Sequence, residues 1–154
     1  MSTFAGLPAH ILLVHAIVVL VPLTTVLLIA CAVWPAARSR VLWLAAGLAV
    51  LVVGLTPLTT EAGEWLQGKL GPAPAIQEHA DLGNQMLYFV VPLPVAAALL
   101  IVVRLREQRG RPLGRAVLAL VAVLVVAAGA AATVQTYRVG DSGSRAVWGG
   151  IADS

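Results

Sequence analysis

The chain alternates between long apolar stretches and short polar connections. Four stretches contain no Asp, Glu, Lys or Arg, and each is about as long as the roughly 20 residues that a helix needs to cross a bilayer core. They cover residues 11–34, 41–60, 82–103 and 116–134. A membrane-spanning strand is about half that length and alternates apolar with polar residues. The pattern therefore predicts an all-α, polytopic membrane protein built as a bundle of four transmembrane helices.

Composition supports the same prediction and limits the chemistry. The 154 residues suit a single domain, expected over 1–154, and 60% of them are apolar while 11% are charged. Soluble domains carry about 25% charged residues, and the mean hydropathy of this chain is +0.93. The one cysteine, Cys31, excludes an internal disulfide and any zinc or iron–sulfur centre held by several cysteines of this chain.

Arginines gather in two of the polar connections. Seven arginines and one glutamate lie in 35–40 and 104–115, whereas the N-terminus, the 61–81 connection and the tail together hold three basic and six acidic residues. Positive connections stay on the cytoplasmic side of a membrane, so we expect both termini outside. Because the basic residues adjoin spans, we expect the lipid bilayer as their partner and no nucleic acid.

Three further segments leave structural alternatives. Residues 60–70 either lie as an amphipathic stretch at the outer interface or continue the second helix. Gly140, Ser142 and Gly143 predict a turn in the tail, with Asp141 as its cap. Small residues over 127–132 favour close helix packing, either inside the bundle or in a homo-oligomer.

All three histidines fall at the predicted outer ends of spans. Imidazole binds haem iron and transition metals, and four-helix bundles hold such centres between facing helices. If the histidines hold haem b, His15 and His79 are the expected pair of ligands, with His10 as the alternative ligand. Gly83 follows His79 by about one helical turn and would leave room for a flat ligand.

The histidines also have two other interpretations. They can serve packing alone, by hydrogen-bonding backbone carbonyls or a carboxylate. The second is a proton path through His15, Glu61, Glu64 or Asp81, although the inner halves of the spans are almost wholly apolar. The sequence contains no nucleophile–base pair and no phosphate-binding loop, so we expect a role without catalysis.

Several short motifs, taken together, resemble a bacterial membrane protein family known as domain of unknown function 2231. These motifs are Gly6 to His10 with Leu12 to His15, Thr56 to Leu66, Glu78 to Gly83, and Arg138 to Gly143 with Ala146 to Trp148. The resemblance implies a four-helix protein of the bacterial cytoplasmic (inner) membrane. Some members are fused to a Rieske-type iron–sulfur domain, which implies a redox setting.

The resemblance also implies which positions matter. The family-like residues are His10, His15, Glu61, Glu64, His79, Gly83, Gly140, Asp141, Ser142, Gly143 and Trp148. This chain departs from the family in having Ile11 where relatives often have Pro, and Asp141 where some have His. The implied function is an accessory or scaffold component of a membrane redox complex, with a Rieske-type protein as partner. The alternative is a small b-type haem electron carrier that uses the outer-side histidines.

Overall fold

A computed structural model describes the backbone of residues 3–4, 7–71 and 73–152 and the side chains of residues 8–71 and 73–149; Gly6 of the first motif lies outside them. A short antiparallel pair, β1 (Thr3–Phe4) and β2 (Leu7–Pro8), precedes the helices. The helices are α1 (Ala9–Val33), α2 (Pro35–Leu70), α3 (Pro74–Asn84), α4 (Met86–Val90), α5 (Pro92–Gln108) and α6 (Arg115–Ala152).

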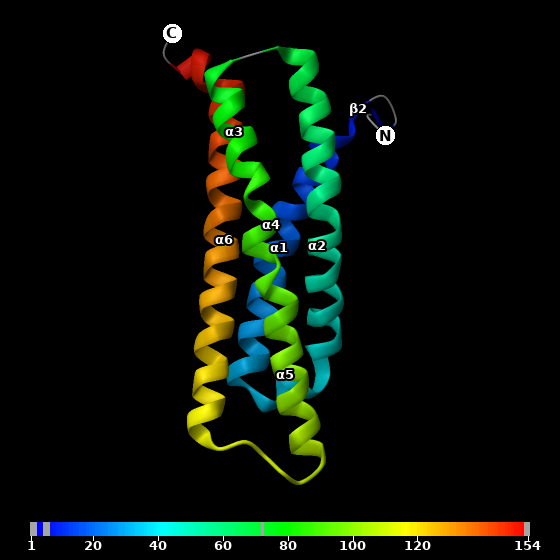
Figure 1. Ribbon diagram of the computed structural model, residues 1–154, viewed down its shortest axis with the longest axis vertical. Coiled ribbons are helices and arrows are strands. Elements are labelled where there is room, and N and C mark those ends of the chain that lie inside the picture. Colours follow the sequence, from blue (N-terminus) through cyan, green and yellow to red (C-terminus); the bar gives the residue numbers. More distant parts are fainter. Residues whose placement is uncertain (1–2, 5–6, 72, 153–154) are drawn as a thin grey trace.

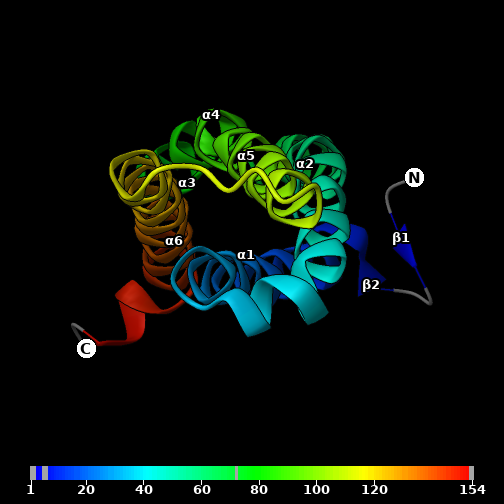
Figure 2. The same ribbon diagram turned by 90° about the horizontal axis from the view of Figure 1, so that it is seen from below.

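Four helical rods run side by side along the long axis of the molecule (Figure 1). They are α1, α2, the succession α3–α4–α5, and α6, and each includes a stretch long and apolar enough to cross a membrane. α1 packs against α2 and α6, and α5 packs against the same two helices, so the rods enclose one core (Figure 2). The predicted all-α bundle with four spans is confirmed. α1 nearly coincides with its predicted apolar stretch, whereas the other three rods extend well beyond theirs.

The two ends of the bundle differ in chemistry. Both termini and the connection between α2 and α3 lie at one end, and the two arginine-rich connections lie at the other (Figure 1). We call the first the histidine end, because His10, His15 and His79 lie toward it. We call the second the arginine end. Which end faces the cytoplasm stays a prediction from the positions of the arginines.

The core is a stripe of side chains contributed by all four rods. Buried positions recur mostly at intervals of three or four along α1, α2, α5 and α6, as one face of a helix requires. On α1 they are Ile17, Val21, Thr24, Thr25, Leu28 and Cys31. Facing helices contribute small residues such as Ala45, Ala49, Ala96 and Ala97. Because lipid gives little hydrophobic drive for helix association, close packing of small residues and interhelical hydrogen bonds hold such bundles together.

α1 and α6 approach each other closely in the core. A Cβ atom placed on Gly129 would lie 2.5 Å from Cγ2 of Thr25. The Thr25 hydroxyl donates to the Gly129 carbonyl at 3.3 Å and accepts from the Thr133 hydroxyl at 3.2 Å. Gly129 thus packs inside the bundle, whereas Ala127 and Ala131 are exposed, and a homo-oligomer through that exposed face stays a prediction.

A buried arginine closes the arginine end. Trp34 adopts an extended conformation (φ −125°, ψ 107°) between α1 and α2, as a residue before proline prefers. Arg38 is only 4% exposed; it donates to the Cys31 carbonyl at 3.1 Å and to Glu107 at 2.9 Å. Its positive charge therefore caps the C-terminus of α1 and joins α2 to α5.

The third rod is interrupted twice, unlike the other rods. A turn at Gln85 separates α3 from α4, and another turn precedes Pro92 at the start of α5. Pro92 and Pro94 lack the backbone donors that would continue the helical ladder. Pro22 and Pro57, in contrast, lie inside α1 and α2, which continue past them.

Two segments at the histidine end adopt helix. Residues 60–70 continue α2, so the second helix extends through them as one of the two alternatives proposed. The predicted turn over Gly140–Gly143 is wrong, because α6 runs through it to Ala152. The physical reason is that α6 packs against α3 at this level, with Ser142 buried and Gly143 against an α3 side chain. This packing outweighs the intrinsic tendency of glycine to leave a helix.

Candidate functional site

Two histidines from different rods meet at the histidine end. His10 lies in the first turn of α1, and His79 lies midway along α3. Their ring centroids are 6.1 Å apart and the ring planes are nearly perpendicular, at 80°. Both side chains are partly buried. We call these two residues the histidine pair.

Both rings of the histidine pair are anchored through the same nitrogen. Nδ1 of His10 lies 3.0 Å from the Thr59 carbonyl oxygen on α2. Nδ1 of His79 lies 3.1 Å from the Val139 carbonyl oxygen on α6 and 3.1 Å from the Ser142 hydroxyl. A carbonyl only accepts, so Nδ1 carries the proton in each neutral ring and Nε2 keeps its lone pair. Each ring thus presents a metal-binding nitrogen in a fixed orientation.

A glycine lies against each ring of the pair. Gly63 is four residues beyond Thr59, and a Cβ atom there would lie 2.9 Å from Cε1 of His10. Gly143 is four residues beyond Val139, and its Cβ would lie 2.9 Å from Cε1 of His79. The same local unit therefore occurs in both halves of the chain, with a histidine on one helix and a carbonyl and glycine on the helix packed against it.

The structure places the third histidine elsewhere. The His15 side chain is exposed, and its Nδ1 donates to the Ile11 carbonyl of its own helix at 2.6 Å. His15 and His79 are therefore not brought together, and His10 takes the position that we expected for His15. Gly83 lies beside open space, because no neighbouring atom comes within 4 Å of where its Cβ would be.

The candidate carboxylates do not converge on the histidine pair. Glu61, Glu64 and Asp81 are exposed, and Asp141 forms an ion pair with Arg145 at 3.0 Å. Among the described residues, no group of three or more His, Cys, Asp or Glu side chains is arranged to hold a metal ion. The donor set available here is two imidazoles.

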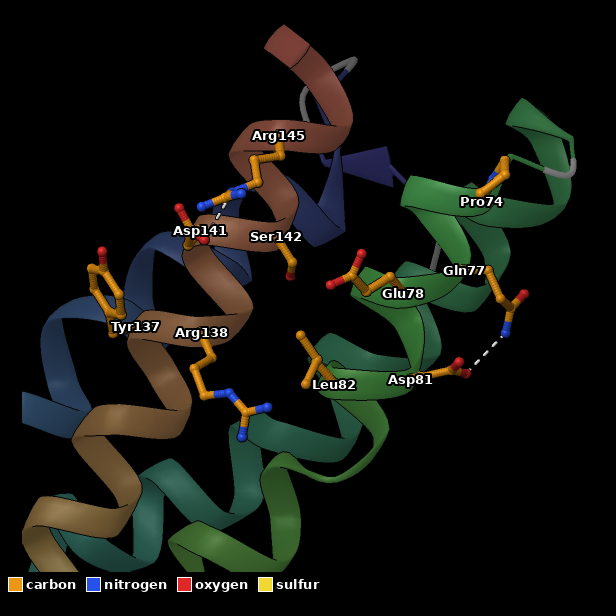
Figure 3. Close-up of a pocket in the computed structure, with 10 residues that line it drawn as sticks. All are labelled: Pro74, Gln77, Glu78, Asp81, Leu82, Tyr137, Arg138, Asp141, Ser142 and Arg145. Carbon is orange, nitrogen blue, oxygen red and sulfur yellow. Dashed lines mark hydrogen bonds and ion pairs between the residues drawn. The ribbon is translucent and has the colours of Figure 1, made fainter.

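A groove with a volume of about 690 Å³ lies beside the pair, between α3 and α6. Figure 3 shows Glu78 reaching into it from α3 and Arg138 from α6, with Leu82 low in the groove and the pair formed by Asp141 and Arg145 along its rim. We call it the α3–α6 groove.

Sequence reasoning missed the residues that organise this region. Thr59 and Val139 act through their backbone carbonyls, which no side-chain motif can reveal. Gly63 lay within a family-like motif without a role of its own. Arg138 began a family-like motif and counted among the three basic residues of the acidic side, but the sequence assigned it no role of its own.

Comparison with known proteins identifies a family. A family model described as "Predicted membrane protein (DUF2231)" matches residues 6–152, nearly the whole chain. No curated protein and no solved structure matches the chain. Together with four helices of membrane-spanning length and apolarity, the match shows a multi-pass integral membrane protein.

Proposed function

We propose that this chain, which belongs to the DUF2231 family of predicted membrane proteins, is an electron-transfer component of a bacterial membrane redox complex and holds haem b through His10 and His79. The observation that carries the proposal is the histidine pair itself. Its rings come from two different rods, are 6.1 Å apart and are each anchored through Nδ1.

The donor set of the pair fits a metal centre. A histidine that binds a metal usually donates its other ring N–H to a carbonyl or carboxylate, and both rings here already make that bond to a carbonyl. Two imidazoles that bind one metal through Nε2 at about 2 Å have centroids roughly 4.5 to 6.3 Å apart, depending on the angle at the metal. The observed separation of 6.1 Å lies near the upper end of that range. Held by His10 and His79, haem b would supply the transfer of single electrons.

The protein's own contribution would be orientation and shielding. The Thr59 and Val139 carbonyls fix the tautomer and direction of each ring, and Gly63 and Gly143 let the rings lie close to the neighbouring helices. His10 and His79 would both hold the haem, so this site would serve electron transfer rather than the binding of a substrate, in keeping with a role without catalysis. The positions of the arginines support a location in the cytoplasmic membrane with the histidine end outside.

The second candidate is an accessory or scaffold protein without a cofactor. One observation favours it: each ring fills the space above a glycine, so the pair already joins neighbouring helices without a ligand. The charged α3–α6 groove would then offer a surface to a partner such as a Rieske-type protein. This candidate requires a colourless protein that retains partner binding when the histidines are replaced.

The two candidates can be separated with three alanine variants. Wild type, His10→Ala, His79→Ala and the matched control His15→Ala are purified in mild detergent from haem-replete cells. Visible spectra are recorded in the oxidised and dithionite-reduced states. We expect a Soret band and sharp reduced α and β bands, at about one haem per chain, in the wild type and in His15→Ala. Both other variants should lose the haem while keeping the helical circular dichroism of the wild type.

Three outcomes would contradict the haem proposal. A featureless wild-type spectrum would remove haem, and elemental analysis of the same sample would then show whether the pair retains a bare transition-metal ion. Loss of haem in His15→Ala to the same extent would show that the assigned pair is wrong. Retention of haem in both other variants would place its ligands elsewhere.

A further inference from the structure

Two opposite charges face the α3–α6 groove without pairing with each other. The Glu78 carboxylate points from α3 toward α6, and the Arg138 guanidinium lies lower, near Leu82 (Figure 3). Among the described residues, neither Glu78 nor Arg138 forms an ion pair. The other opposite charges on the rim, Asp141 and Arg145, already pair at 3.0 Å. Asp81 also lines the groove, but its carboxylate accepts from Nε2 of Gln77 at 2.9 Å and points away from α6 (Figure 3). The space between α3 and α6 therefore presents the carboxylate of Glu78 and the guanidinium of Arg138 to whatever enters it.

A buried glutamine positions the cation. Gln135 is 1% exposed, and its side-chain oxygen accepts from Nη1 of Arg138 at 3.4 Å. Its amide nitrogen donates to the Leu82 carbonyl on α3 at 3.0 Å. Gln135 thus links α6 to α3 at the base of the groove and holds Arg138 between them. The remaining guanidinium N–H groups are available, and guanidinium groups bind phosphate in a bidentate manner.

Below Arg138, the exposed face of α6 is apolar. Val134, Ala131 and Ala127 follow at intervals of three or four residues, and all are exposed, so they share one face of the helix. Tyr137, 72% exposed, lies on the groove wall at the level where interfacial aromatic residues occur. The side chains of Ala131 and Ala127 are small, so they protrude little from this face. It is a suitable track for an acyl chain whose headgroup occupies the groove.

We propose that the α3–α6 groove binds a phospholipid with a zwitterionic, amine-bearing headgroup, such as phosphatidylethanolamine. The phosphate would bind Arg138, and the ammonium group would bind Glu78. An anionic headgroup without an amine would satisfy Arg138 but would leave Glu78 facing a second negative charge. The lipid would hold α3 against α6 at the level of Ser142, which lines the groove and contacts His79. Lipid binding in the groove would not depend on which cofactor the histidine pair holds.

Native mass spectrometry of the detergent-purified protein tests the proposal. The protein is incubated with equal amounts of phosphatidylethanolamine and phosphatidylglycerol, and each retained lipid is counted. The preference rests on the additional charged contact between the ammonium group and Glu78, so we expect roughly a tenfold or greater preference for phosphatidylethanolamine. Glu78→Gln should remove the preference, and Arg138→Gln should remove retention of both lipids. Arg138→Lys should restore part of it, and Glu64→Gln, exposed on α2 outside the groove, should behave as wild type.

A soluble competitor distinguishes a lipid from a free zwitterion. Glycerophosphoethanolamine carries the same charges without acyl chains, and we expect it to displace the lipid only in large excess. Displacement at equal concentration would show that the groove takes a soluble zwitterion and would overturn the lipid proposal. Equal retention of both lipids by the wild type, or an unchanged preference in Glu78→Gln with native helical circular dichroism, would also overturn it.

Discussion

Replacing Gly129 by alanine tests the close contact between α1 and α6. The added methyl carbon would lie 2.5 Å from Cγ2 of Thr25 and 3.3 Å from its Cβ and Oγ1. Carbon atoms attract best at about 3.5–4.0 Å, so the two methyl groups would overlap by at least about 1 Å. Thr25 cannot easily turn away, because its β-branched side chain is stiff and its hydroxyl bonds to Gly129 and Thr133.

Two effects of opposite sign determine the change in stability. Overpacking a core costs about 1–3 kcal/mol, while alanine is about 0.8–1 kcal/mol more favourable than glycine inside a helix. Gly47→Ala in α2 is a matched control, because no neighbouring atom lies within 4 Å of its Cβ position. Both variants gain the same helix propensity. Their difference in unfolding free energy therefore reports the strain alone, and we expect Gly129→Ala to be less stable than Gly47→Ala by about 1–3 kcal/mol.

Unfolding by sodium dodecyl sulfate in mixed micelles, followed by far-UV circular dichroism, measures these free energies. Thr25→Ser removes the offending methyl and keeps the hydroxyl, so combining it with Gly129→Ala should recover most of the loss. Such non-additivity is expected between residues in contact. The reasoning is refuted if Gly129→Ala is as stable as Gly47→Ala, or if Thr25→Ser does not rescue it.

Three further predictions concern other parts of the bundle. Glu107→Gln should lower the unfolding free energy by about 1–3 kcal/mol, because it leaves the buried charge of Arg38 without its counter-ion; an unchanged denaturation curve would contradict this. In a background without the native cysteine, a cysteine introduced at Ser144 should react with a membrane-impermeant maleimide on intact cells. A cysteine introduced at Ser39 should react only after the cells are permeabilised, and the reverse result would invert the predicted orientation. Gly63→Ala should displace the adjacent imidazole, 2.9 Å from the new Cβ, and should therefore abolish the proposed haem spectrum without unfolding the protein; an unchanged spectrum would show that this ring is not a ligand.

The spans could be predicted because the bilayer imposes a strong requirement. A helix in hydrocarbon must satisfy its own backbone hydrogen bonds and present apolar side chains over about 20 residues. That requirement acts on each segment separately, so local composition suffices to find the four rods. The predicted turn in the tail was wrong because it considered only the local tendency of glycine to form turns. In the structure, the packing of Ser142 and Gly143 against α3 keeps that segment helical.

The histidine pair could be predicted only in part. All three histidines were expected at one end, and they lie toward that end. The choice between His10 and His15 depends on how α1 is rotated about its axis. In a soluble helix the polar face reveals that rotation, but α1 is apolar on all sides and carries no such contrast. The buried positions Ile17, Val21 and Thr24 show the rotation in the structure, and His10 lies in register with them, seven residues before Ile17.

The sequence by itself determined that the chain lies in lipid, how many times it spans the bilayer and at which end of the bundle the histidines lie. Each of these follows from the cost of placing charge or unbonded backbone in lipid. Tertiary structure alone decided which imidazole faces His79, which carbonyls fix the two rings, and that Glu78 and Arg138 share one groove. These relations depend on the rotation and contact of whole helices. Those are set by close packing of small residues such as Gly129 against Thr25, and that packing exists only once the rods have assembled.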